Sequence, residues 1–178
     1  GPQRSSLISV PFFHVTGCFA VLNPSLFAGA KLVMMHKWDA VRAFELIERE
    51  KIQSAGGVPT IAWQLIEHPA RANYDLSSLE SVAYGGAPSA PELVRRLSET
   101  FPKSQPSQGW GMTETCATVT SNGAEDYTHR PDSCGPAAPV AELKIVDPAD
   151  GVTELPIGAV GELWAKGPMV VKGYWNKP

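Results

Sequence analysis

Residues 108–115 carry, within one short segment, the side chains best suited to bind a nucleotide. Their sequence is QGWGMTET, in which two glycines flank Trp110, and Thr113 and Glu114 follow. A tryptophan between glycines can present its ring face to a planar base, and a threonine hydroxyl can donate to a phosphate oxygen. A glutamate suits Mg²⁺, which keeps water and substrate phosphates as its other ligands. The segment predicts a nucleotide and magnesium site; the alternative is that Trp110 lies in the core and Thr113 caps a short helix.

A second candidate segment, YGGAP at residues 84–88, stands between a predicted strand and a predicted helix. Open α/β sheets bind their ligands at such positions. Because Gly85 and Gly86 lack a Cβ, a flat ligand can lie against their backbone. The alternative is a tight strand-to-helix turn that binds nothing.

Two further segments indicate a particular chemistry less clearly. His14 lies in PFFHVTG, residues 11–17, directly after the first predicted strand. A histidine among aromatic residues is either a satisfied core residue or a group that gates an apolar acid pocket or bonds a carboxylate. The other segment, residues 161–175, predicts a strand, a turn and a second strand, and carries no mechanism by itself.

The elements that must position these segments alternate along the chain. Apolar runs predict strands over residues 7–10, 31–35, 52–56 and 79–84. Helical spacing of apolar residues predicts helices over residues 16–28, with an interruption at Asn23-Pro24, over 39–51, from Pro59 onward, and over 89–101. Strands separated by helices in this way indicate an α/β fold, with a mainly parallel sheet and helices on both faces.

Local signals fix several helix ends. Asp39 is placed to cap the helix that carries the apolar stripe of Val41, Phe44 and Ile47, on which Glu45 and Arg49 are four residues apart and can pair. The sequence SAPE at residues 89–92 predicts a capping box for the helix that follows it.

After about residue 131 the pattern becomes β-rich. Residues 141–146 alternate apolar and charged side chains, residues 147–151 form a turn, and residues 160–166 predict a strand antiparallel to the first. We therefore expect an α/β unit over residues 1–130 and a β-rich unit over residues 131–178.

Composition excludes several classes of function. The 178 residues include 15 basic and 18 acidic side chains, for a net charge of -3, and no basic run that would bind nucleic acid. Three cysteines without a C-x-x-C pair support neither a disulfide framework nor a zinc site, and favour the cytoplasm. The stretch between Arg4 and Lys31 lacks charges, but prolines and polar residues interrupt it, so we predict no transmembrane segment.

Taken in order, the segments PFFHVxG, YGGAP, GWGMTET and GELWxKGxxxxxGYW strongly resemble the adenylate-forming (AMP-binding) superfamily of acyl-CoA synthetases, luciferases and peptide-synthetase adenylation domains. The resemblance looks closest to bacterial fatty-acyl-CoA synthetases, because KIQ at 51–53 precedes VPT at 58–60 and YDLSSL follows at 74–79. It implies the second α/β subdomain of the family's amino-terminal domain, followed by the beginning of its β-barrel subdomain. It also implies a ligase that activates a fatty acid with ATP and Mg²⁺ to acyl-AMP and transfers the acyl group to coenzyme A.

The resemblance assigns a role to each matched residue. Glu114 would ligate Mg²⁺, Thr113 would bind the α-phosphate, and His14 would lie beside the acyl carboxylate and the path of the thiol. The nucleotide would contact two groups of residues: Gly85, Gly86 and Ala87 at the junction of adenine and acyl group, and Gly109, Trp110, Gly111 and Met112 around the base. The family usually has tyrosine at the position of Trp110, so stacking is retained but any bond from a phenol hydroxyl is changed.

Other parts of the family pattern are expected outside these residues. The phosphate loop should precede residue 1, and the ribose-binding aspartate and catalytic lysine should follow residue 178, so we expect an amino-terminal-domain fragment that is inactive by itself. Two alternatives stay open: an adenylation domain that loads an amino or aryl acid onto a carrier protein, and a nucleotide-binding module without catalysis.

Overall fold

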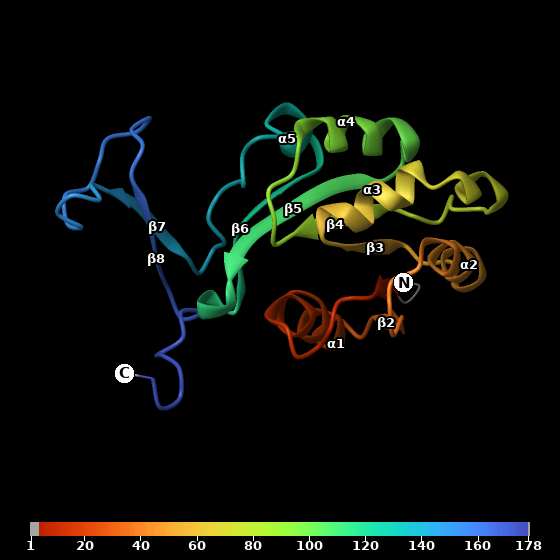
Figure 1. The fold of residues 1–178 in the computed structure, drawn as a ribbon, viewed down its shortest axis with the longest axis horizontal. Coiled ribbons are helices and arrows are strands. Elements are labelled where there is room, and N and C mark those ends of the chain that lie inside the picture. The colour runs from red at the N-terminus through yellow and green to blue at the C-terminus, as the bar shows by residue number, and fades with distance from the viewer. Residues whose placement is uncertain (1–3, 178) are drawn as a thin grey trace.

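A six-stranded sheet with helices on both faces forms most of the computed structural model, which describes residues 4–177 (Figure 1). The strands lie in the order β2-β1-β3-β4-β5-β6; all neighbours are parallel except β5 and β6, which are antiparallel. Their bounds are β1 Ser5–Ile8, β2 Lys31–Met34, β3 Ser54–Gly57, β4 Ser81–Gly85, β5 Gln105–Met112 and β6 Ala117–Gly123. The predicted α/β fold with a mainly parallel sheet is confirmed.

The helices connect these strands. They are η1 Thr16–Leu22, α1 Asn23–Phe27, α2 Ala40–Glu50, α3 Pro59–Glu67, η2 Pro69–Asn73, α4 Pro91–Thr100, η3 Thr113–Thr115 and α5 Ala124–His129. Within residues 4–177, none of them is both long enough and apolar enough to cross a membrane.

The main core lies between the sheet and the helices α2 to α5. Alternate residues of the strands, Leu7, Ala55 and Val82, point to this face and meet fully buried side chains such as Phe44 of α2. The segment η1–α1, in red, lies on the opposite face, below β4 in Figure 1. The carboxyl ends of the parallel strands, where we expect the site, thus emerge between two helical layers.

Helix α2 begins as its sequence predicts. Asp39 has an extended backbone, and its carboxylate accepts the Arg42 N–H at 2.7 Å. Two residues of the predicted stripe, Phe44 and Ile47, are fully buried, and the third, Val41, is half-buried.

Replacing this cap gives a first test of the fold. We expect Asp39→Ala to lower the free energy of unfolding by about 1 kcal/mol, because the Arg42 N–H loses its acceptor. Chemical denaturation measures the change. Asp39→Asn keeps a capping oxygen and should unfold like the parent protein; an equal loss in both variants would show that the cap contributes nothing.

Two of the predicted local contacts are wrong. Helix α4 begins at Pro91 after Ala90, no side chain caps it, and Glu92 instead binds Arg95 one turn later. The capping box fails because Ser89 lies one residue too far from the first helical residue. The expected Glu45–Arg49 pair also fails, because both side chains have nearer partners: Arg42 lies 2.6 Å from Glu45, and Arg49 lies 2.9 Å from Glu50.

The sequence pattern does not predict β5 and β6. Strand β5 contains Pro106, Gly109 and Gly111 and lacks β-branched residues, so it has no local strand signal. Its pairing with β4 on one side and β6 on the other decides its conformation. The predicted helix over 16–28 is also more complex, since a π-helical turn over 16–22 changes to an α-helix at Asn23-Pro24.

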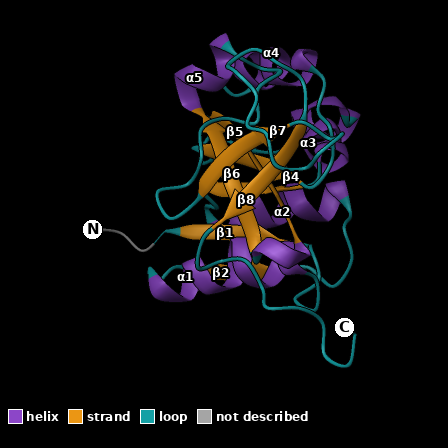
Figure 2. Ribbon diagram, turned by 90° about the vertical axis from the view of Figure 1, so that its left-hand side faces the viewer, coloured by secondary structure: helices purple, strands orange, loops and turns teal. Residues whose placement is uncertain are grey.

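A separate two-stranded sheet follows the α/β part. Its strands, β7 Glu142–Val146 and β8 Glu162–Lys166, pair antiparallel, as the sequence predicts. The Lys144 ammonium lies over the Trp164 ring at 4.9 Å from its centre. Figure 2 views the molecule from the side of this hairpin, which lies in front of the larger sheet, beyond the carboxyl ends of its parallel strands.

Candidate functional site

The turn after β4 brings two of the sequence segments together. Gly85, at the end of β4, pairs with Gly109 of β5. A Cβ on Gly85 would lie 2.5 Å from the Gly109 carbonyl oxygen, so the close approach of the two strands requires glycine here. Gly86 has a φ of +78° and nothing within 4 Å of its Cβ position, and Gly86 and Ala87 are exposed. The turn therefore offers open backbone to a ligand beside the Trp110 segment.

A buried pair of tyrosines lies at the end of β4, next to this turn. The Tyr84 hydroxyl donates to the Tyr127 hydroxyl of α5 at 2.9 Å, and both side chains are buried. Burial is the main cause that raises the pKa of Tyr84. The pair fixes the residue that immediately precedes the glycine turn.

Removing one member of this pair should be costly. We expect Tyr127→Phe to lower the free energy of unfolding by about 2 kcal/mol, because it leaves the buried Tyr84 hydroxyl without this partner. Tyr84→Phe combined with Tyr127→Phe should cost less than the sum of the two single losses, since no hydroxyl is then left unpaired. Denaturation of the three variants measures the coupling, and additive losses would contradict it.

The Trp110 segment forms the end of β5, where this strand pairs closely with β6. Trp110 is half-buried and pairs with Thr120, and the register shifts between Trp110 and Gly111. A Cβ on Gly111 would lie 1.5 Å from the Ala117 carbonyl oxygen. Because Trp110 is outside the buried core cluster, the interpretation of this ring as a core residue is wrong.

The turn between these strands carries Thr113 and Glu114. They lie in η3, where the Thr113 side chain is exposed and Glu114 is partly exposed. Thr115, not Thr113, stabilises this short helix: its Oγ1 accepts the Met112 N–H at 3.0 Å. The expected alternative, Thr113 as a cap, is therefore wrong, and the Thr113 hydroxyl makes no capping bond.

Glu114 is held by a segment 60 residues later in the chain. The Tyr174 hydroxyl donates to Glu114 Oε1 at 2.7 Å, and the Val171 N–H donates to the Glu114 carbonyl oxygen at 2.8 Å. The bond from Tyr174 is the main cause that lowers the pKa of Glu114, so the carboxylate is charged at neutral pH. Sequence reasoning missed Tyr174; its only signal was the GYW of residues 173–175, which carried no mechanism alone.

Glu114 is the side chain of this turn whose chemistry suits a magnesium ion. Within residues 4–177, no group of three or more histidine, cysteine, aspartate or glutamate side chains could hold a metal. Glu114 could therefore supply one carboxylate ligand, with phosphates and water as the others, which is a common arrangement for Mg²⁺. Glu114 accepts one bond from Tyr174, and a carboxylate has room for further partners.

His14 lies at the same end of the sheet but is not joined to the other site residues. Its side chain is exposed, and its Nδ1 accepts the Thr16 N–H at 3.2 Å at the start of η1. The interpretation as a satisfied core histidine is wrong. No hydrogen bond in the described part of the chain links His14 to Thr113 or Glu114, although η1 itself contacts β6.

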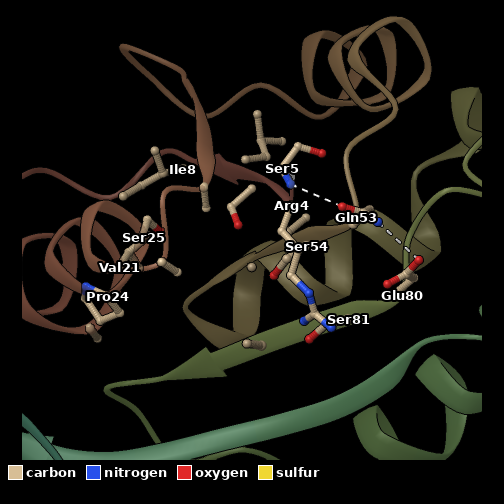
Figure 3. Close-up of a pocket in the computed structure, with 18 of the residues that line it drawn as sticks. Arg4, Ser5, Ile8, Val21, Pro24, Ser25, Gln53, Ser54, Glu80 and Ser81 are labelled. Carbon is tan, nitrogen blue, oxygen red and sulfur yellow. Dashed lines mark hydrogen bonds between the residues drawn. The ribbon is translucent and has the colours of Figure 1, made fainter. Parts of the chain in front are cut away.

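A cavity of about 1100 Å³ lies on the sheet face opposite the main core. In Figure 3, Val21 and Pro24 of the η1–α1 segment lie on one side of it, and Ser54 and Ser81 of the strands lie on the other. None of the predicted site residues lines this cavity, and the sequence gives no signal for it. Its lining includes Ala83, which lies two residues before Gly85 on the same face of β4.

Comparison with known proteins gives a consistent family. A family model described as AMP-binding enzyme matches residues 1–175. Over 175 residues the chain is 37% identical to 4-coumarate-CoA ligase 1 of Narcissus pseudonarcissus, a match that covers 97% of this chain and 32% of that protein. The chain thus spans about a third of the length of this relative.

Comparison with solved structures supports the same family. The N-terminal domain of FACL13 from Mycobacterium tuberculosis superposes with a TM-score of 0.86 at 28% identity, over 99% of this chain and 43% of that one. A putative long-chain-fatty-acid CoA ligase from Rhodopseudomonas palustris superposes with a TM-score of 0.84 at 31% identity, over 98% and 42%. The o-succinylbenzoate CoA synthetase MenE from Bacillus subtilis has a TM-score of 0.85 at 26% identity, over 99% and 35%. Because the family model matches residues 1–175, nearly the whole of its length, this chain belongs to the AMP-binding enzyme family.

Proposed function

We propose that the protein carrying this chain is an AMP-forming acid–CoA ligase. The observation that carries the proposal is the pairing of Gly85 with Gly109, which places the exposed turn 85–87 beside Trp110 and leads directly to Thr113 and Glu114. The relatives described above include ligases that join carboxylic acids to coenzyme A, and they support the same reaction class.

In the proposed first step, a carboxylate oxygen of the acid attacks the α-phosphorus of ATP, and pyrophosphate leaves. Adenine would stack on Trp110 against the backbone of Gly85, Gly86 and Ala87, within the segment that also carries Gly109, Gly111 and Met112. The Thr113 hydroxyl would donate to the α-phosphate, and His14 would lie beside the acid. Glu114 would hold Mg²⁺, which when bound offsets the charge on the phosphates. Orientation and charge stabilisation therefore account for most of the catalysis.

In the proposed second step, the sulfur of coenzyme A attacks the acyl carbonyl, the thiol proton is released to solvent, and AMP leaves. A sulfur–carbon bond replaces the carbon–oxygen bond to the phosphate. These steps predict acyl-CoA, AMP and pyrophosphate in equal amounts as products.

We further propose that the boundary between the two units lies at residues 130/131, which the separate β7–β8 sheet supports. We also propose a cytoplasmic location, which the three free cysteines support.

Within this class we propose a fatty acid as the substrate. Ala83 lines the cavity, and two strand residues, about 7 Å, separate Ala83 from Gly85 at the expected reacting end. Val10 and Val21 contribute apolar surface to the cavity. An acid bound at the glycine turn could therefore extend its chain along this face of the sheet. An aryl acid is the second candidate, because the chain is 37% identical to a 4-coumarate-CoA ligase.

A product assay on the full-length protein tests both statements. Acids from acetate through long fatty acids to 4-coumarate and amino acids are each incubated with ATP, Mg²⁺ and coenzyme A, and the products are identified by mass spectrometry. We expect fatty acyl-CoA and AMP. Thioester from 4-coumarate alone would overturn the substrate class, and ADP in place of AMP would overturn the reaction.

A single substitution tests the path of the acyl chain. We expect Ala83→Phe to shift the preferred fatty acid to shorter chains, with activity on the shortest acids retained, because the new ring would occupy part of the cavity that Ala83 lines. Ala149→Phe introduces the same ring at an exposed position that does not line the cavity, and as the matched control it should keep the original preference. An unchanged chain-length profile in Ala83→Phe would show that the acyl chain lies elsewhere.

A further inference from the structure

Two hydrogen bonds from one distant segment hold Glu114. Val171 binds its backbone carbonyl at 2.8 Å, and Tyr174 binds its carboxylate at 2.7 Å. Both donors follow β8, whereas Glu114 lies in the three-residue helix η3 between β5 and β6. The segment that holds the carboxylate therefore comes from a different sheet.

Without this contact, Glu114 would have considerable freedom. Its side chain is partly exposed, and Tyr174 provides the only side-chain hydrogen bond to its carboxylate from residues 4–177. A glutamate loses about 1–2 kcal/mol of side-chain entropy when it is fixed in one conformation. A bond that fixes the carboxylate before the substrate binds removes that cost from the binding step.

Packing in the core does not explain the position of Tyr174. Its side chain is 56% exposed, and the next residue, Trp175, is 92% exposed. A tight turn holds its backbone, since the Lys177 N–H donates to the Tyr174 carbonyl oxygen at 3.1 Å. The contact that distinguishes Tyr174 from its neighbour is thus the bond from its hydroxyl to Glu114.

We propose that Tyr174 is a positioning residue for adenylation, whose hydroxyl orients the Glu114 carboxylate toward the phosphates of ATP. The proposal rests on the proposed function and adds to it a residue of the segment after β8. One oxygen of Glu114 accepts the phenol proton, and the carboxylate keeps capacity for a cation. The segment after β8 thereby contributes a residue to the site formed by β5 and η3.

The test is a double-mutant cycle in the full-length protein. Acid-dependent exchange between ATP and pyrophosphate is measured for Tyr174→Phe, Glu114→Gln and the double variant, with Trp175→Phe as the matched control. We expect Tyr174→Phe to lower kcat about tenfold, the effect of losing one bond to a charged group. In the Glu114→Gln background the same change should have almost no effect, and Trp175→Phe should behave like the parent protein.

A spectroscopic measurement checks the contact without any turnover. In protein labelled with ¹³C at the ζ carbon of tyrosine, the signal that Tyr174→Phe removes belongs to Tyr174. We expect Glu114→Gln to shift this signal and Glu99→Gln to leave it in place. An unshifted signal, or an equal loss of kcat from Tyr174→Phe in both backgrounds, would overturn the proposal. A parent protein without exchange would refute the proposed function, whereas an active parent with an unimpaired Tyr174→Phe variant would refute only the role of Tyr174.

Discussion

Glu114→Gln is expected to lower the acid-dependent formation of acyl-AMP by the full-length protein about 100-fold or more. The substitution keeps the size of the side chain and removes its charge. In the structure this charge is stabilised by the Tyr174 hydroxyl, which keeps the pKa of Glu114 below its ordinary value. The proposed role of Glu114 requires a charged oxygen beside the phosphates, and an amide cannot replace it.

Two controls make this expectation specific. Glu114→Gln should unfold at the same denaturant concentration as the parent, because Glu114 is partly exposed and outside the core. Glu99→Gln changes an exposed glutamate that pairs with Arg95 on α4, and it should keep full activity. An active Glu114→Gln variant would contradict the assignment of Glu114 to the reacting phosphates.

Gly111→Ala is expected to have the largest effect on stability, lowering the free energy of unfolding by about 3 kcal/mol. A Cβ at this position would lie 1.5 Å from the Ala117 carbonyl oxygen, and backbone atoms cannot move aside as a side chain can. Cys116 and Ala117 already have positive φ angles of 49° and 81°, so the reversal has little freedom to adjust. The β5–β6 pairing, and with it the position of Glu114, should be disturbed.

Gly109→Ala on the same strand is the matched control for stability. Its Cβ would approach the Thr118 Cγ2 at 3.3 Å, and this methyl group belongs to a side chain that can rotate. We expect a loss of about 1 kcal/mol, measured by chemical denaturation. If Gly111→Ala were as stable as the parent, the register that pairs Gly111 with Thr118 and Met112 with Ala117 would be wrong.

Local signals in the sequence were sufficient for much of the α/β part. The stripe of Phe44 and Ile47 and the cap at Asp39 predict α2. The alternation of apolar and charged side chains over residues 141–146 predicts β7. In each case the signal and the element lie within one short segment. Local pattern and observed structure agree where no distant contact competes.

The candidate site depends more on distant contacts. Strand β5 has no strand pattern of its own and forms because β4 and β6 supply its hydrogen bonds. Tyr174 reaches Glu114 across 60 residues of sequence, a contact that periodicity and spacing do not reveal. Residue types thus predicted what Trp110, Thr113 and Glu114 could bind, but only the fold revealed what holds Glu114 in place.

The most direct test of the central claim is exchange between ATP and labelled pyrophosphate by the full-length protein without coenzyme A. If an acyl-adenylate forms at this site, exchange should require a carboxylic acid and Mg²⁺ and should proceed in the absence of the thiol. Glu114→Gln should abolish most of it. Exchange that no acid supports, or that begins only when coenzyme A is added, would contradict the account.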